Sequence, residues 1–124
     1  MLRLAETKNE LNIVCDQIGS PTYTYDLSKL MCDMIETNKF GVYHATNEGI
    51  CSWYEFTKYI FEVAGITNVK VNPITTKEYQ SMVKQAYRPL NSRMSKDKLV
   101  KNGFNRLPDW HDAVKRYIHD ELKR

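Results

Sequence analysis

Only three short segments of this sequence have the pattern expected of a β-strand, and helical segments separate them. The strand-like segments cover residues 11–18, 41–47 and 69–74, and they are rich in Ile, Val or Tyr. Each is followed by a segment with a helix-start signal. Three strands are too few for a free-standing doubly wound sheet, so the sequence predicts an α+β fold with about three short strands and four or five helices.

The turn Gly19-Ser20-Pro21 is predicted to end the first strand, because proline cannot donate to a β-ladder. A helix is expected after it, capped by Thr22 or Thr24, with Asp26 in its first turn. The apolar residues of this helix recur at helical spacing and predict one buried stripe, made of Leu27, Leu30, Met31, Met34 and Ile35.

The clearest helix begins at Ser52, since Ser52 and Glu55 have the spacing of a capping box and Gly65 can end the helix. Its predicted apolar face consists of Trp53, Phe56, Ile60 and Val63. On this pattern Trp53 is interpreted as a core residue rather than as a platform that stacks on a sugar or base. Thr75 and Glu78 repeat the capping-box spacing before a short helix.

Three further helical segments are expected. Residues 2–9 resemble the last turns of a helix, and Ser95 is predicted to cap a brief helix that Gly103 stops. Pro108 suits the first turn of a closing helix. In that helix the residues predicted to face inward are Trp110, Ala113, Val114, Tyr117 and Ile118, and those predicted to face outward are His111, Lys115, Arg116, His119 and Lys123.

Composition limits the class of protein. With 124 residues, 42% hydrophobic and 27% charged, the chain is expected to form one globular domain over residues 1–124. Its three cysteines, an odd number without a Cys-x-x-Cys pair, predict no disulfide framework and no metal site, which favours reduced thiols in the cytoplasm. No run of about 18 apolar residues and no apolar leader occur, so neither a membrane span nor a secretion signal is expected.

The net charge of +3 is small, but its distribution is uneven. Residues 88–106 contain six cations against the single acid Asp97: Arg88, Arg93, Lys96, Lys98, Lys101 and Arg106. This segment either faces a phosphate or forms a solvated helix surface. A small basic nucleic-acid-binding domain is therefore one alternative interpretation, although we expect that the protein has no nucleic-acid partner.

Two tyrosine–lysine pairs have the i, i+4 spacing by which a reductase delivers a proton: Tyr25 with Lys29, and Tyr54 with Lys58. Such a pair needs a nicotinamide beside it, and the sequence has no glycine-rich dinucleotide loop after a strand. Both pairs are therefore interpreted as coincidences. His44, His111 and His119 have no nucleophile pattern nearby and are interpreted as surface or satisfied core residues.

The Arg-Pro segment is more informative. Pro89 pushes Arg88 into an extended conformation, and Asn91, Ser92 and Arg93 follow with further donors. A planar guanidinium with such neighbours suits a diphosphate or sugar hydroxyls. Structural hydrogen bonding between domains remains an equal alternative at this point.

The segments "VCDQIGSPTYTYDL", "GVYHATNEGICSWYEF", "AYRPLNSRMSKDKL" and "LPDWHDAVK" occur in this order over nearly the whole chain. Together they resemble the C-terminal, substrate-binding half of the dTDP-4-dehydrorhamnose reductases, within the extended short-chain dehydrogenase family. The resemblance implies that an N-terminal Rossmann part, absent from this chain, binds NADPH and carries the catalytic Tyr-x-x-x-Lys upstream of Met1. It also implies that residues 1–18 are a remnant of the body shared with that part, and that Tyr25-Asp26-Leu27-Ser28-Lys29 is not the active site.

On this resemblance no catalytic, cofactor-binding or metal-binding residue is expected in the chain. The expected substrate-binding residues are Gln17, Thr22, Arg88, Asn91, Ser92 and Arg93. The implied activity is NADPH-dependent reduction of dTDP-4-dehydro-L-rhamnose to dTDP-L-rhamnose, for cell-surface polysaccharide, by a cytoplasmic enzyme for which a homodimer is possible. This chain alone is expected to be inactive. A second alternative within the same family is a non-catalytic regulatory subunit such as that of methionine adenosyltransferase.

Overall fold

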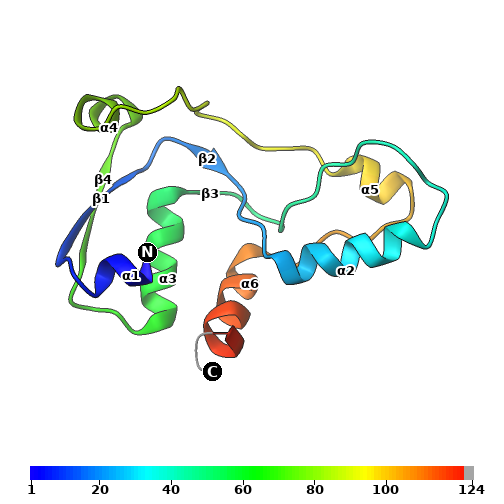
Figure 1. Ribbon diagram of the computed structural model, residues 1–124, viewed down its shortest axis with the longest axis horizontal. Coiled ribbons are helices and arrows are strands. Elements are labelled where there is room, and N and C mark those ends of the chain that lie inside the picture. The colour runs from blue at the N-terminus through cyan, green and yellow to red at the C-terminus, as the bar shows by residue number, and fades with distance from the viewer. Residues whose placement is uncertain (122–124) are drawn as a thin grey trace. The chain divides into compact units, whose positions relative to one another are not determined.

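A computed structural model describes residues 1–121 of the chain. The fold is α+β, as the sequence predicted, and its residues divide into two compact units (Figure 1). The first unit comprises Met1–Gly19 and Cys51–Ser92, and the second comprises Ser20–Ile50 and Arg93–Arg124. The expectation of a single domain over residues 1–124 stays a prediction.

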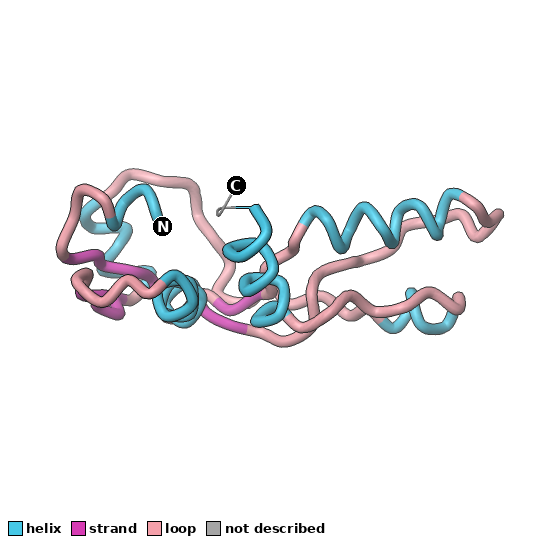
Figure 2. The backbone as a smooth tube through the Cα atoms, turned by 90° about the horizontal axis from the view of Figure 1, so that it is seen from below, coloured by secondary structure: helices cyan, strands magenta, loops and turns pink. Residues whose placement is uncertain are grey.

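The first unit is built on a pair of parallel strands. Strand β1 (Glu10–Val14) pairs with β4 (Lys70–Ile74) in a register that runs from Glu10 opposite Lys70 to Val14 opposite Ile74. The strands are drawn in magenta in Figure 2. Helix α3 (Trp53–Ala64) contributes Phe61 to a core with Leu11 and Val69. A single turn of helix, α1 (Leu2–Ala5), begins this unit, where the sequence predicted the end of a longer helix.

Helix α3 confirms the predicted caps but corrects the predicted face. The Ser52 hydroxyl accepts from the Glu55 N–H, the Glu55 carboxylate accepts from the Ser52 N–H, and Gly65 ends the helix at φ +70°. The buried residues, however, are Thr57 and Phe61, and Phe56, Ile60 and Val63 are only partly buried. Trp53 is 53% exposed, so its prediction as core was wrong. The core cluster packs on the C-terminal half of α3, which leaves the first turn outside it.

The predicted strand over residues 11–18 is interrupted. Its second part forms β2 (Ile18–Gly19), which pairs antiparallel with β3 (Cys51–Ser52). The interruption arises because Asp16 leaves the ladder and accepts a hydrogen bond from the N–H of Thr76, the first residue of helix α4 (Thr76–Met82). The predicted capping box of α4, formed by Thr75 and Glu78, is confirmed.

The second unit consists of helices and long loops. Helix α2 spans Thr24–Ile35, α5 spans Asp97–Lys101, and α6 spans Trp110–Arg116 and continues as the π-helical turn η1 (Tyr117–Glu121). The core of this unit is formed by Leu30, Leu99, Phe104 and Leu107.

Several predictions for helix α2 were wrong. The residue before the helix is Tyr23, and neither Thr22 nor Thr24 caps it with a side-chain hydrogen bond. Of the predicted stripe, Leu30 is buried and Met34 packs against the core, because these residues lie four apart and face Leu99 and Phe104. Met31 and Ile35 lie one position further round the helix and are 55% and 79% exposed.

Residues 41–47 do not form the predicted strand. Among the described residues no strand lies beside them to complete a ladder, and the nearest β-type pairing is an isolated bridge between Glu48 and Asp109. His44 is accordingly exposed on a loop rather than held in a strand.

The termini of α5 and α6 also differ from prediction. Lys96, not Ser95, precedes α5, although the Ser95 hydroxyl accepts from the Asp97 N–H at 3.3 Å. Helix α6 is capped by Asp109 rather than begun by Pro108.

The predicted faces of the closing helix are partly confirmed. The inward residues Trp110, Ala113, Val114 and Ile118 are buried, whereas Tyr117 is 45% exposed. Arg116 was predicted to face outward, but it is partly buried because it pairs with Asp26. The prediction for Lys123 lies outside the described residues. Within residues 1–121 no helix has the length and apolar character needed to cross a bilayer.

Candidate functional site

The segment that contains the predicted Arg-Pro site is tied to strand β2. Ile18 donates its N–H to the Leu90 carbonyl at 2.8 Å, and Ser92 donates its N–H to the Ile18 carbonyl at 2.9 Å. These two bonds enclose Asn91, which forms a parallel bridge with Ile18. The backbone after Pro89 is thus held by hydrogen bonds to a strand. The extended conformation predicted for Arg88 itself stays a prediction.

Gly19 permits the close approach of this segment. A Cβ atom at Gly19 would lie 2.6 Å from the Ser92 hydroxyl oxygen. That hydroxyl also reaches the Ile18 carbonyl at 3.2 Å. A larger residue at position 19 would therefore force the Ser92 hydroxyl to rotate out of its present position, which gives the glycine of the predicted turn a packing role.

Arg88 lies just before this anchor. All residues from 81 to 95 are exposed, so the guanidinium of Arg88 is open to solvent. Asn91 and Ser92 are exposed on the same segment, and Asn91 has an interaction of its own. The first unit therefore exposes the guanidinium of Arg88 and the polar side chains of Asn91 and Ser92 on a segment that is hydrogen-bonded to strand β2.

Gln17 is placed at the start of helix α4. Its Nε2 donates to the Thr76 hydroxyl at 3.1 Å, while the Asp16 carboxylate accepts from the N–H of Thr76 at 2.9 Å. Thr76 is buried, so this contact fixes the half-buried Gln17 amide. One N–H and the oxygen of that amide remain for a ligand hydroxyl.

The other two predicted residues, Thr22 and Arg93, belong to the second unit, and both are exposed. Thr22 lies on the turn that follows Ser20-Pro21. This turn is held by Asn47, whose Oδ1 accepts from the Tyr23 N–H at 2.7 Å and whose own N–H donates to the Pro21 carbonyl at 3.2 Å.

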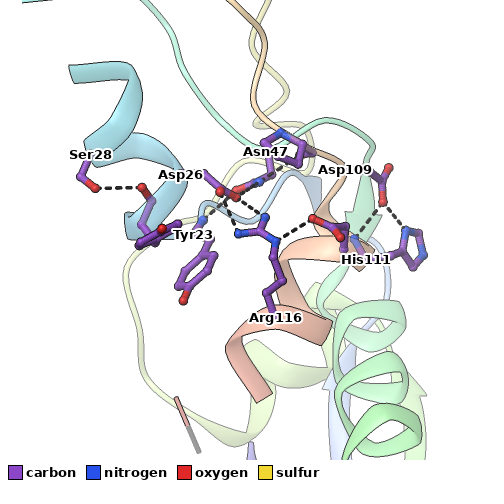
Figure 3. Close-up of polar contacts among 10 residues, drawn as sticks. Tyr23, Asp26, Ser28, Asn47, Asp109, His111 and Arg116 are labelled. Carbon is purple, nitrogen blue, oxygen red and sulfur yellow. Dashed lines mark hydrogen bonds and ion pairs between the residues drawn. The ribbon is translucent and has the colours of Figure 1, made fainter. Parts of the chain in front are cut away.

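A buried polar cluster lies behind this turn (Figure 3). Arg116 donates two hydrogen bonds to the two carboxylate oxygens of Asp26, at 2.9 and 2.7 Å, and a third to Asp112 at 2.7 Å. Asn47 Nδ2 donates to Asp26 at 2.8 Å. The Asp26 side chain is only 5% exposed, so these bonds replace the water that burial has removed.

The electrostatics of the cluster favour ionised Asp26. Burial acts to raise the pKa of Asp26, but the hydrogen bonds from Arg116 and Asn47 and the charges of Arg116 and Lys29 outweigh it and lower the pKa below its ordinary value. The same contact with Asp26 raises the pKa of Arg116. Both members of the pair therefore stay charged around neutral pH.

Sequence reasoning missed this cluster. Asp26 was interpreted as a first-turn acid of α2 and Arg116 as an exposed residue of the closing helix. The i, i+4 spacing of Asp112 and Arg116 was the available signal, because it places an ion pair on one helix face. No local pattern connects Asp26 with Arg116, which follows it by 90 residues.

The tyrosine–lysine pairs have a geometry that differs from that of a proton donor. The Lys29 ammonium lies over the face of the Tyr25 ring, 4.5 Å from its centroid, and Lys58 lies 5.4 Å from the centroid of the Tyr54 ring. These are cation–π contacts at exposed or partly exposed positions. Among residues 1–121 no cluster of His, Cys, Asp and Glu is suited to hold a metal ion.

The basic segment is partly neutralised by its own surroundings. Lys96 lies 3.2 Å from Glu48, with only 10% of its side chain exposed, and Arg106 contacts both Glu48 and Asp97 at 3.3 Å. Lys98 donates to the Val42 carbonyl at 2.8 Å. At least Lys96, Lys98 and Arg106 thus have partners within the second unit, which reduces the charge available for a polyanion.

The fold is α+β, and it exposes a polar segment that is anchored to a strand. The sequence matches the family described as the RmlD substrate binding domain over residues 1–123, and the chain belongs to this family.

Relatives and solved structures agree with this assignment. The chain is 41% identical to the spore coat polysaccharide biosynthesis protein SpsK of Bacillus subtilis, over 97% of this chain and 40% of the relative. It is 37% identical to a dTDP-4-dehydrorhamnose reductase of Sinorhizobium fredii, over 95% of this chain and 42% of the relative.

Among solved structures, the dTDP-4-dehydrorhamnose reductase of Clostridium acetobutylicum is similar with a TM-score of 0.90 and 37% identity, over 99% of this chain and 42% of that one. The reductase of Bacillus anthracis, solved in complex with NADP, gives a TM-score of 0.88 and 38% identity, over 97% of this chain and 41% of that one. The chain therefore spans only 40–42% of the length of these proteins.

Proposed function

We propose that this chain is the nucleotide-sugar-binding part of a reductase that converts dTDP-4-dehydro-L-rhamnose to dTDP-L-rhamnose with NADPH. The observation that carries the proposal is the family match over residues 1–123, joined to the anchored and exposed segment around Arg88. Relatives named dTDP-4-dehydrorhamnose reductase support the reaction, and a relative solved with NADP supports the cofactor.

The residues proposed to bind the nucleotide sugar are Gln17, Thr22, Arg88, Asn91, Ser92 and Arg93. The Arg88 guanidinium is suited to a diphosphate, because its planar fork can donate two parallel hydrogen bonds. Asn91, Ser92 and Gln17 carry the neutral donors and acceptors that sugar hydroxyls need. We assign no catalytic residue and no metal ligand to this chain.

NADPH supplies the hydride for the C4 ketone, and we propose that it is bound by the part of the reductase that corresponds to the other 58–60% of the relatives' length. The role of the present residues is to orient the nucleotide sugar so that its ketone meets that hydride. A cytoplasmic location and a possible homodimer belong to the same proposal.

The test is a chimera in which this chain replaces the matching 42% of the Clostridium acetobutylicum reductase. We expect the chimera to oxidise NADPH in the presence of dTDP-4-dehydro-L-rhamnose, with the parental enzyme as positive control, and the 124-residue chain alone to oxidise none. A chimera that binds NADPH but leaves this sugar nucleotide unreduced would refute the proposal. Turnover by the chain alone that disappears in Tyr25→Phe would show that Tyr25 is catalytic after all.

A further inference from the structure

The turn that carries Thr22 is held on one side by the side chain of Asn47 and on the other side by its backbone N–H. Thr22 is flanked by Pro21 and Tyr23. The Tyr23 N–H donates to the side-chain oxygen of Asn47, and the Pro21 carbonyl accepts from the backbone N–H of Asn47. Asn47 is 0% exposed, whereas Thr22 is exposed. The buried residue therefore fixes the backbone on both sides of an exposed hydroxyl.

The orientation of the Asn47 amide is determined by its partners. Its oxygen accepts from the Tyr23 N–H, and its Nδ2 donates to Asp26 at 2.8 Å and to the Pro108 carbonyl at 2.9 Å. Both amide protons are thus used. A flipped amide would set Nδ2 against the Tyr23 N–H and the oxygen against a carboxylate and a carbonyl, so only one orientation satisfies all groups.

Asn47 is in turn held by the Asp26–Arg116 pair. Asp26 receives two hydrogen bonds from Arg116, and Arg116 is also fixed by Asp112 on its own helix. A further hydrogen bond restrains the turn, because the Ser20 hydroxyl donates to the Gly49 carbonyl at 2.6 Å. Helices α2 and α6 therefore support the turn through one continuous set of hydrogen bonds (Figure 3).

We propose that Asn47 is a positioning residue that holds the Thr22 hydroxyl in the place where it contacts the nucleotide sugar. This inference rests on the proposed function and deepens it by adding a residue that touches no substrate. The physical reason is that a binding group must be held within a fraction of an ångström, and an exposed turn without a β-ladder cannot supply that restraint by itself.

The test compares three variants of the 124-residue chain: Asn47→Ala, Thr22→Val and, as a control, Leu99→Val. Leu99 is a core residue of the same unit and is 1% exposed, so its truncation lowers stability without touching the turn. NMR titration with dTDP-L-rhamnose is expected to show affinity about tenfold weaker in Asn47→Ala and in Thr22→Val, and unchanged in Leu99→Val. The double variant Thr22→Val/Asn47→Ala should bind no more weakly than either single variant, because both lose the same contact.

A second readout needs no ligand. Amide hydrogen exchange at Tyr23 should be faster in Asn47→Ala, because its N–H loses its acceptor, while exchange in helix α6 changes far less. Unchanged affinity in Asn47→Ala beside weakened affinity in Thr22→Val, or additive losses in the double variant, would overturn the inference. If the unmodified chain fails to bind dTDP-L-rhamnose, the proposed function and the inferred ligand contact both fail, even if Tyr23 exchange shows that Asn47 holds the turn.

Discussion

The Asp26–Arg116 pair offers a sharp prediction because its two members differ in burial. The Asp26 side chain is 5% exposed and the Arg116 side chain is 29% exposed. Removing one partner of a buried pair costs about 3–5 kcal/mol of unfolding free energy, because the remaining charge cannot return to water. The loss of unfolding free energy therefore depends on whether the buried Asp26 or the more exposed Arg116 remains unpaired.

In Arg116→Met the carboxylate of Asp26 stays buried, with only the Asn47 amide as a donor. We expect a loss of about 3–4 kcal/mol, in the lower half of the range for an uncompensated buried charge, because the Asn47 amide still donates to Asp26. In Asp26→Asn the arginine keeps Asp112 and reaches solvent, so the expected loss is only about 1.5–2.5 kcal/mol. The double variant should be less destabilised than the sum, by about 1–2 kcal/mol, because the second change removes a charge that is already unpaired.

The assay is urea denaturation followed by tryptophan fluorescence in a Trp53→Phe background. Trp110 then reports on the second unit alone, in which it is 3% exposed. Since the pKa of Asp26 is lowered by folding, the stability from this pair is complete above the ordinary value of 3.8 and is lost as the pH falls through the lower folded-state value. Equal losses in the two single variants, or a strictly additive double variant, would refute the reasoning.

Three further predictions concern single positions. Ser52→Ala should lower the unfolding free energy of the first unit by about 1 kcal/mol through loss of the α3 cap, and an unchanged denaturation midpoint would argue against the capping box. Gly49→Ala should lower the unfolding free energy more than Gly65→Ala does. Both glycines have positive φ, which strains alanine by about 1–3 kcal/mol, but only at Gly49 would the new Cβ also lie 2.8 Å from Asp109 and Trp110. Equal melting temperatures of the two variants would contradict this packing. In the chimeric reductase, Arg88→Lys should weaken nucleotide-sugar use by about 1.5–3 kcal/mol with NADPH binding unaltered, whereas a lowered melting temperature with unchanged kinetics would make Arg88 a structural brace.

The local signals for the boundaries of α3 and the start of α4 were confirmed, whereas those for the starts of α2, α5 and α6 were not. The capping boxes at Ser52 and Thr75 and the terminal glycine at position 65 depend on residues within one helix, and all three are confirmed. The segment after Pro89, by contrast, is held by hydrogen bonds to Ile18, a residue more than 70 positions away in the sequence.

Predictions that needed a distant partner were less successful. Residues 41–47 have a strand-like composition, but a strand requires a neighbour, and none lies beside them in the described structure. Burial on α2 was overestimated because the residues of the second unit that pack on it, Leu99 and Phe104, reach only one side of the helix. The hydrogen bonds of Asn47 could not be predicted, since its partners Pro21, Asp26 and Pro108 are distributed across the whole second unit.

We propose above that this chain binds the nucleotide sugar and not the cofactor. The most direct measurement is an NMR titration of the 124-residue chain, once with dTDP-L-rhamnose and once with NADPH. We expect saturable shifts with dTDP-L-rhamnose at Gln17, Thr22 and the amides of residues 88–93, and no saturable shifts with NADPH. Saturation by NADPH, or sugar-nucleotide shifts confined to residues outside this set, would contradict it.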